Sequence, residues 1–571
     1  MKKMRVTVKI YLLLIILAAT TIIKGQPVEM LNIHTDRIRF ISGEDLWFSI
    51  YNTDEATGLL TSTSQIAYAE LINPWNIPVV RLRIKLTEGR GNGSFPLPDS
   101  LSSGEYTLRV YTNRMKDNLP SGCAMKVIGV YSPFRGSSYL RKSSIADSLC
   151  RSLHRSLRRS LHNTGEKAII VSDTSFGRRE KVSVKILTER TGSVTPEFYD
   201  MSVSVAPSSV SDTIPEFGRN NGSLAHSSLN DFESEGHFLS LRIRSRDGNS
   251  AGRHNRLFMS VQGKVAGFRY AEMDSSGRFT FILPVDSKQR TFIVQPEIPD
   301  NEMSLEIESS FAPVMPESGY FKDSLRGKES EVFESLSFNH QANRIYGITF
   351  KKEKEERESG NNLIRRFYGI PEMEIFLDDY IKLPDMTEVF FELLPGILLR
   401  EGKNGYEVKI TNPLTGIFYE EPPLVMIDGV ILNDLNVLAG LDPELVEKIE
   451  VVKTPYLTGD LILHGIVNVI TRSGDFSKIT MPDYAAIFPY RVAEPGYDFI
   501  SPSYNEEQSG SARKPDLRNT IYWNPSVWTD PDGIAAFEFW TPDVPGRYSV
   551  TVMGISGSGK KISAIKSFNV K

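Results

Sequence analysis

Residues 422–475 read PPLVMIDGVILNDLNVLAGLDPELVEKIEVVKTPYLTGDLILHGIVNVITRSGD, and their pattern predicts a compact α+β domain. Two apolar runs flank Asp428-Gly429, a dipeptide that accepts the positive φ angles of a tight turn, so the first part predicts a β-hairpin. Asp442 can cap a helix that starts at Pro443 and leads into the β-branched run 449–452. The alternating run 466–471 predicts a further strand.

Four motifs follow one another in this part of the chain: PLVMIDGV at 423–430, KIEVVK at 448–453, YLTG at 456–459 and GIVNVIT at 465–471. In this order they resemble the plug domain of TonB-dependent outer-membrane receptors, and we assign residues 366–478 to a plug-like domain. His464-Gly465 stands where that family usually has a pair of small residues. The resemblance implies a location at the outer membrane and a protein partner there.

A complete receptor of this kind also contains a β-barrel of about 22 strands with about 10 residues each. Only residues 476–571 follow the plug-like segment. We therefore expect the chain to lack the barrel, so that its plug-like domain is a free module or acts on another protein.

The N-terminus has a basic start at Lys2, Lys3 and Arg5, followed by an apolar run over 10–23. The run is too short to cross a bilayer and has the layout of a secretory signal peptide, which we place at residues 1–25. No later segment approaches 18 apolar residues, so no transmembrane segment is expected in the mature chain. We expect the protein in the periplasm or at the outer membrane. Near the C-terminal end, Gly546 and Tyr548 together with Lys566 and Lys571 faintly resemble the sorting signal of type IX secretion cargo, which leaves secretion to the surface open.

Short alternating runs between Gly and Pro turns fill residues 26–130 and predict a β-sandwich. GEDLWFSI at 43–50, GNGSFPLP at 91–98 and LSSGEYTLRVY at 101–111 resemble the macroglobulin-like domains of bacterial α-macroglobulins. The Cys-Gly-Glu-Gln run that gives protease-trapping macroglobulins their thioester is absent.

Two further segments hold about half a sandwich each: 166–210 has two or three strands and 518–571 about four. Because neither covers both faces of a sandwich alone, we predict one discontinuous macroglobulin-like sandwich made from both. A small regulatory-type sandwich at 236–315 and the plug-like domain would be inserted into it, with both ends of the insertion seated on it. The fold class is then mainly β, with several macroglobulin/Ig-like β-sandwiches plus one small α+β domain.

The connecting segments are predicted as a basic helical linker at 131–165, a linker at 316–365 and an extended loop at 479–517. In the first, Leu149, Leu153, Leu157 and Leu161 recur every four residues with arginines between them, which indicates a basic amphipathic helix. This helix either contacts an acidic partner or anionic lipid, or docks its leucines on the neighbouring sandwich. The Ser-, Asn- and Gly-rich run 220–235 predicts a mobile loop, and the charge run 351–358 a solvated linker.

Cys123 and Cys150 are the only cysteines. In an exported protein they either form a disulfide or remain two thiols, and the sequence leaves both alternatives open. Their spacing does not match a zinc site.

No motif of a known catalytic site is present, neither Gly-x-Ser-x-Gly nor His-Glu-x-x-His. GISGSGKK at 554–561 matches a phosphate-binding loop as far as its lysine, but Lys561 replaces the hydroxyl residue and a strand is expected to follow. DPDG at 530–533 predicts a β-turn rather than a calcium loop. The net charge of −4 provides no field for nucleic acid. We therefore predict no catalytic, cofactor-binding or metal-binding residues and no enzymatic activity.

The sequence thus predicts a non-enzymatic envelope protein whose plug-like domain docks to an outer-membrane β-barrel or translocon protein. In a sharper version, the domain occludes a pore supplied by that partner. The alternative is a macroglobulin-type protease inhibitor or an envelope hydrolase without a recognised motif.

Overall fold

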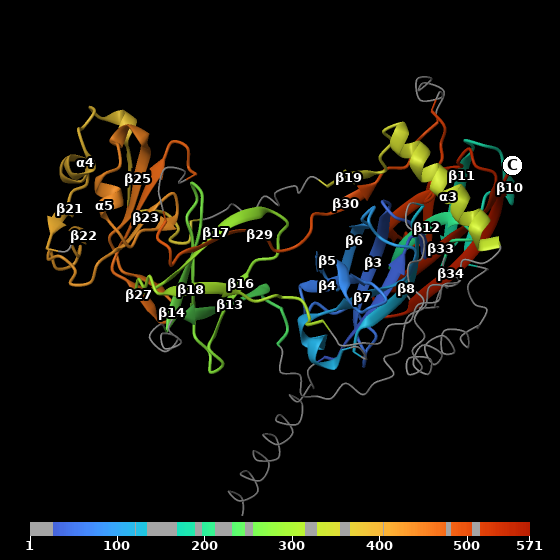
Figure 1. The fold of residues 1–571 in the computed structure, drawn as a ribbon, viewed down its shortest axis with the longest axis horizontal. Helices are drawn as coiled ribbons and strands as arrows, with labels where there is room; N and C mark the ends of the chain where they lie inside the picture. The colour runs from blue at the N-terminus through green and yellow to red at the C-terminus, as the bar shows by residue number, and fades with distance from the viewer. Residues whose placement is uncertain are drawn as a thin grey trace, which may run out of the picture. The chain divides into compact units, whose positions relative to one another are not determined.

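The computed structural model describes residues 27–119, 122–133, 168–188, 197–211, 231–245, 255–314, 328–354, 366–403, 405–475, 481–504 and 514–571. The fold of these residues is mainly β, as predicted. The chain forms two compact units: the first contains Met1–Ser234, Pro313–Lys354 and Glu494–Lys571, and the second contains Glu235–Ala312 and Glu355–Ala493 (Figure 1). The predicted signal peptide and residues 134–165 of the basic helical linker lie outside the described residues.

The first sandwich of unit 1 consists of a three-stranded sheet, β1-β3-β6, and a five-stranded sheet, β2-β8-β7-β4-β5. Its strands are β1 (Glu29–Thr35), β2 (Arg39–Ile41), β3 (Asp45–Asp54), β4 (Ile66–Ile72), β5 (Pro78–Lys85), β6 (Arg90–Pro96), β7 (Gly104–Tyr111) and β8 (Ala124–Tyr131), with the 3-10 helix η1 (Asn113–Asn118) after β7. β3 is buried on both faces. One face is covered by a second sandwich, where the Tyr51 hydroxyl donates to the Met553 carbonyl oxygen at 2.5 Å.

The second sandwich of unit 1 is built from two segments that are far apart in sequence. Its sheets have the orders β10-β34-β33-β12-β31 and β32-β11-β9. The early strands are β9 (Ile169–Val171), β10 (Ser175–Phe176), β11 (Lys181–Leu187) and β12 (Tyr199–Pro207), and the late strands are β31 (Tyr522–Trp528), β32 (Ile534–Trp540), β33 (Gly546–Ser556) and β34 (Lys561–Val570). Because β11 pairs with β32 and β12 lies between β31 and β33, the two segments complete one another.

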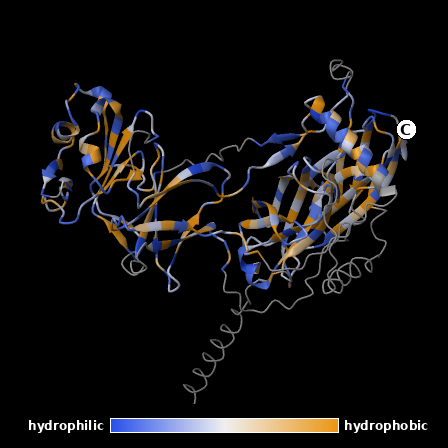
Figure 2. Cartoon of the chain, in the orientation of Figure 1, coloured by the Kyte–Doolittle hydropathy of each residue, from blue (hydrophilic) through white to orange (hydrophobic). Residues whose placement is uncertain are grey.

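Alternation explains why these strands join. Val182, Val184 and Ile186 of β11 are fully buried, whereas the lysines on either side of them point to solvent. In the antiparallel register Val182 faces Phe539 and Val184 faces Phe537, so each apolar row of one segment covers the apolar row of the other. Figure 2 shows apolar residues along the strands of the sheets.

The predicted linker 316–365 and extended loop 479–517 contain regular structure. Helix α3 (Lys328–Ile345) lies in the first of them and packs Phe333 and Leu336 against Ile41 and Val210 of the two sandwiches. The charge run 351–358 contributes β19 (Lys351–Glu353), which pairs with β30 (Tyr497–Phe499) from the predicted loop. Lys351 forms a 2.8 Å ion pair with Asp45, so the charges are used in docking this two-stranded ribbon. Residues 351–353 thus form a strand rather than an irregular linker, although Lys352 and Glu353 remain exposed.

The chain leaves and re-enters unit 1 beside strands of the first sandwich. The Gln65 amide donates to the Glu233 carbonyl oxygen at 2.9 Å, and the Glu494 amide donates to the Arg83 carbonyl oxygen at 2.8 Å. The Glu233 carboxylate is fully buried and accepts a hydrogen bond from the Tyr68 hydroxyl at 2.9 Å. Residues 231–234, predicted as part of a mobile loop, are therefore fixed on the first sandwich, and within unit 1 the segment that begins at Glu494 is fixed there too.

Unit 2 begins with the small sandwich, whose sheets have the orders β16-β13-β18 and β15-β14-β17-β29. Its strands are β13 (His237–Ser245), β14 (Arg256–Val261), β15 (Gly267–Glu272), β16 (Arg278–Leu283), β17 (Gln289–Pro296), β18 (Met303–Ile307) and β29 (Ala486–Arg491). The predicted extended loop thus supplies β29, an edge strand of this sandwich.

The α+β domain follows with a five-stranded sheet of order β20-β25-β28-β23-β24. Its elements are β20 (Met373–Phe376), η3 (Leu377–Asp379), α4 (Met386–Leu393), β21 (Ile397–Gly402), β22 (Gly405–Ile410), β23 (Leu424–Ile427), β24 (Val430–Ile431), α5 (Asn436–Ala439), η4 (Pro443–Leu445), β25 (Val446–Val452), β26 (Tyr456–Thr458), β27 (Leu461–Leu463) and β28 (Ile466–Thr471). The predicted hairpin and last strand are confirmed. Asp442 caps its helix by accepting from the Glu444 amide, but that helix is a single 3-10 turn because β25 begins at Val446.

Candidate functional site

The α+β sheet buries apolar side chains on both of its faces. Val425, Val451 and Val467 point to one face, where α4 supplies Met386, Val389 and Phe390. The opposite face carries Leu424, Met426 and Ile466 and packs against Ala266 and Phe268 of the small sandwich. Since the second core is shared by both domains, the α+β domain and the small sandwich belong together in unit 2.

The central hairpin turn is fitted closely into the small sandwich. Asp428 and Gly429 have φ angles of 48° and 75°, so both lie in the left-handed region that the sequence predicts for this turn. The Asp428 carboxylate accepts from the Thr471 amide at 2.7 Å and from the Thr471 hydroxyl at 2.6 Å. A Cβ atom on Gly429 would lie 2.8 Å from the Val261 carbonyl oxygen, so the turn leaves no room for a side chain.

A buried polar network lies on the face of the sheet that packs against the small sandwich. Glu450, fully buried on β25, accepts a hydrogen bond from the Tyr368 hydroxyl at 2.5 Å and forms ion pairs with Arg366 at 2.6 Å and Lys448 at 2.8 Å. Burial and then the Glu450 carboxylate raise the pKa of Tyr368, so its hydroxyl stays a donor at every ordinary pH. With both carboxylate oxygens partnered, this network fastens the segment around Tyr368 over the sheet and is structural in character.

The exposed side of α4 differs from its buried side in an unusual way. Asp385 caps the helix by accepting from the Glu388 amide at 2.9 Å, which fixes the phase of the following turns. In that phase Phe390 enters the core, whereas the next residue, Phe391, is 70% exposed. A single exposed aromatic side chain is common on protein surfaces, so Phe391 is informative only together with the other exposed apolar side chains of this domain.

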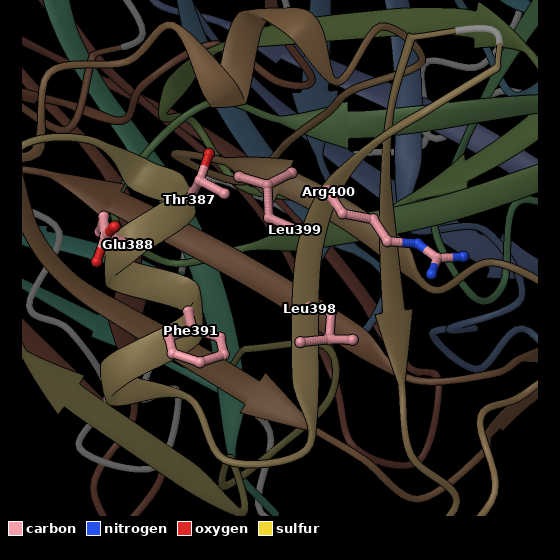
Figure 3. A pocket seen from close by; sticks show the side chains of 6 residues that line it. All are labelled: Thr387, Glu388, Phe391, Leu398, Leu399 and Arg400. Carbon is pink, nitrogen blue, oxygen red and sulfur yellow. The ribbon is translucent and has the colours of Figure 1, made fainter.

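Phe391 borders an open cavity of about 260 Å³ between α4 and β21. Figure 3 shows the lining side chains arriving from these two elements: Thr387, Glu388 and Phe391 from α4, and Leu398, Leu399 and Arg400 from β21. Its volume lies below the roughly 300–1,000 Å³ of small-molecule sites. Arg400 is held at the rim by Glu407, whose carboxylate accepts from its Nε at 2.7 Å.

A second apolar feature follows the same β21–β22 hairpin. The loop 411–418 is closed by hydrogen bonds from the Thr411 amide to the Gly396 oxygen and from the Asn412 amide to the Ile417 oxygen, each 2.8 Å long. Its tip presents Leu414 at 92% and Ile417 at 70% exposure. We call Phe391, Leu398, Leu414 and Ile417 the apolar edge of the α+β domain.

Exposed apolar side chains are concentrated in this domain. Among the described residues, six of the eight large apolar side chains that are at least two-thirds exposed belong to it, namely Ile370, Ile381, Phe391, Leu414, Ile417 and Leu457. The other two, Phe338 and Ile345, lie on α3. The apolar edge was not predicted from the sequence, although the run 410–419 between Lys409 and Glu420 has no charged residue and contains turn-forming Asn-Pro and Thr-Gly pairs.

The two segments of the sequence that partly match ligand-binding motifs form turns in the structure. The segment that resembles a phosphate-binding loop forms the turn between β33 and β34, with the Ser556 amide donating to the Lys560 oxygen at 2.8 Å, and no helix follows it. The 530–533 segment is a β-turn closed by the Gly533 amide on the Asp530 oxygen at 2.9 Å. Within the described ranges, no three His, Cys, Asp or Glu side chains gather closely enough to hold a metal ion.

Cys123 is buried beside β8, and burial raises the pKa of its thiol to about 12. A thiol of that kind is a poor nucleophile at neutral pH. Cys150 lies outside the described residues, so a disulfide and two thiols both remain open alternatives.

No helix in the described part of the chain is long and apolar enough to cross a membrane. Comparison with family models gives no match, and no curated protein matches the sequence. The resemblance of residues 366–478 to a receptor plug domain therefore stays a prediction.

Comparison with solved structures finds bacterial α2-macroglobulins. The trypsin-activated protein from Escherichia coli matches at 10% identity with a TM-score of 0.23, covering 96% of this chain and 42% of the macroglobulin. The methylamine-reacted Salmonella protein matches at 9% identity with a TM-score of 0.25, covering 96% of this chain and 40% of the other. The Escherichia coli adhesin FdeC matches at 9% identity with a TM-score of 0.15, covering 48% and 60% of the two chains. The chain thus spans about two-fifths of the length of these macroglobulins.

Proposed function

We propose that this chain is a non-enzymatic, exported envelope protein that docks on an outer-membrane protein through the apolar edge of its α+β domain. The observation that carries the proposal is the exposure of Phe391, Leu414 and Ile417 on well-braced elements, at 70%, 92% and 70%. Apolar residues held in fixed positions and surrounded by polar ones are typical of protein-binding surfaces. The resemblance to receptor plug domains supports the choice of an outer-membrane protein as the partner.

The shared core favours docking over pore occlusion. To enter a pore alone, the α+β domain would have to separate Leu424 and Met426 from Ala266 and Phe268 of the small sandwich. That separation would expose apolar surface at a cost of about 25 cal/mol per Å². The apolar edge, by contrast, is accessible without any rearrangement of unit 2. In our proposal the partner therefore receives the edge while unit 2 stays intact.

Affinity capture from detergent-solubilised outer membranes tests the proposal. The tagged chain is compared with the triple variant Phe391→Ser, Leu414→Ser and Ile417→Ser, and with the matched control Phe338→Ser and Ile345→Ser on α3. We expect the wild type and the control to retain one stoichiometric outer-membrane protein that the triple variant loses. Equal retention by all three proteins would show that the apolar edge is not the binding surface. Capture of no outer-membrane protein would contradict the proposed function.

A further inference from the structure

A buried charged group joins three parts of unit 1. Asp36 and Arg37 lie between β1 and β2, and Glu44 lies in the turn before β3, with exposures of 1%, 3% and 8%. They meet Thr520 of the segment leading into the second sandwich and, through Asn519, helix α3.

Asp36 sits at the contact between the two sandwiches. Its carboxylate accepts from the Trp47 amide at 2.9 Å, from the Thr520 hydroxyl and from Arg37 Nε, which is 3.4 Å away. Its carbonyl oxygen accepts from the Ser204 hydroxyl of β12. The Thr520 hydroxyl oxygen also accepts from Arg37 Nε at 2.9 Å, so the Asp36–Thr520 hydrogen bond persists whichever oxygen carries the proton.

Glu44 extends the group to α3. It forms a 3.0 Å ion pair with Arg37 and accepts from Asn519 Nδ2 at 2.7 Å. Asn519 Nδ2 also donates to the Leu336 carbonyl oxygen at 3.0 Å, and Asn519 Oδ1 accepts from Asn339 Nδ2 at 3.0 Å. Asn519 therefore links Glu44 to α3, beside the Asn343–Leu517 hydrogen bond and the packing of Phe333 and Leu336 that also hold the helix.

The charges in this group do not balance. Two carboxylates share one guanidinium, which leaves one excess negative charge in a buried site whenever both acids are ionised. Burial is the main reason why the pKa of Asp36 rises to about 6, with Arg37 acting against it and Glu44 with it. On the α3 side the facing titratable group is His340, whose pKa is lowered by burial and which also senses Glu44, Arg344, Arg37 and Asp99.

We propose that Asp36, Arg37 and Glu44 form a proton-dependent clamp, which holds α3 and the second sandwich on the first more tightly in mild acid than at neutral pH. The sign follows from linkage: an acid that binds its proton more strongly when folded contributes stability below its ordinary pKa and loses it as pH rises through the folded pKa. For Asp36 this window runs from about pH 4 to about pH 6 and above. His340 acts in the opposite direction, because a base with a lowered pKa favours the closed state as pH rises.

Hydrogen exchange of the α3 amides in the full chain, corrected for the intrinsic pH dependence of exchange, tests the clamp. The readout is the opening constant of the wild type divided by that of Asp36→Asn, so that His340, present in both proteins, cancels. We expect this ratio to increase about tenfold between about pH 5 and about pH 7.5. Asp117→Asn, at an exposed position of η1, is the matched control and should give a ratio that does not change with pH.

A ratio for Asp36→Asn that is constant over this range overturns the clamp. If that variant does not fold, Glu44→Gln takes its place, since removing the second carboxylate should move the pH dependence of α3 exchange to lower pH. An unchanged pH dependence in Glu44→Gln likewise overturns it.

Discussion

The backbone oxygen of Asp428 accepts a hydrogen bond of 2.9 Å from the Gly263 amide, which ties the central hairpin of the α+β domain to a loop of the small sandwich. Around this bond the two domains share the core of Leu424, Met426 and Phe268. Because the two domains pack together in unit 2, the apolar edge at Phe391 is a surface of unit 2 as one body.

Gly429→Val tests how closely this hairpin is fitted. The variant must place a β-branched side chain at φ 75° and its Cβ atom 2.8 Å from the Val261 oxygen. We expect a loss of about 3 kcal/mol or more in the unfolding free energy of unit 2, measured by urea denaturation. Gly277→Val is the matched control, since Gly277 has the same φ of 75° with open space around it, and about 1 kcal/mol is expected there. Equal losses would show that the collision with the small sandwich does not matter.

Glu450→Gln tests the buried network on the sheet. The substitution leaves Arg366 and Lys448 without their buried carboxylate, so we expect unit 2 to lose about 3 kcal/mol of stability by the same measurement. Glu374 also contacts both cations but is about one-third exposed, so Glu374→Gln should cost under about 1 kcal/mol. A Glu450→Gln protein as stable as the wild type would contradict the description of this network.

Phe539→Ala tests the joining of the two segments of the second sandwich. Phe539 of β32 is 2% exposed and faces Val182 of β11, so its truncation should cost about 3–5 kcal/mol and loosen β11 together with β32. Amide hydrogen exchange of both strands is the measurement, and Ala536→Ser, on the exposed side of the same strand, is the control. Loosening confined to β32 would mean that the two segments are energetically independent.

The sequence identified features that depend on neighbouring residues and missed those that depend on distant ones. The Asp428-Gly429 turn and the alternation of β11 can be read from neighbouring residues. The strands at 166–210 are too few for a sandwich, and this alone predicted that 518–571 supplies the rest. In contrast, β29 contains Pro489 and forms only because β17 offers it an edge. Helix α3 was missed because much of its docking uses the amides of Asn339 and Asn343 rather than an apolar stripe.

The apolar edge was missed for a related reason. Phe390 and Phe391 are identical neighbours in the sequence, and only the phase of α4, set by its cap at Asp385, decides which ring is buried. Exposure of Leu414 likewise depends on how the loop 411–418 is braced against Gly396. Neither property can be read from composition or periodicity.

Site-specific photo-crosslinking in living cells tests the central claim most directly. A photoreactive phenylalanine analogue is placed at Phe391, at Leu414 or, as the exposed control on α3, at Ile345, and the crosslinked products are identified by mass spectrometry. The account predicts that positions 391 and 414 crosslink to the same outer-membrane protein and that position 345 does not. Crosslinks from position 345 alone, or crosslinks from 391 and 414 to unrelated proteins, would contradict it.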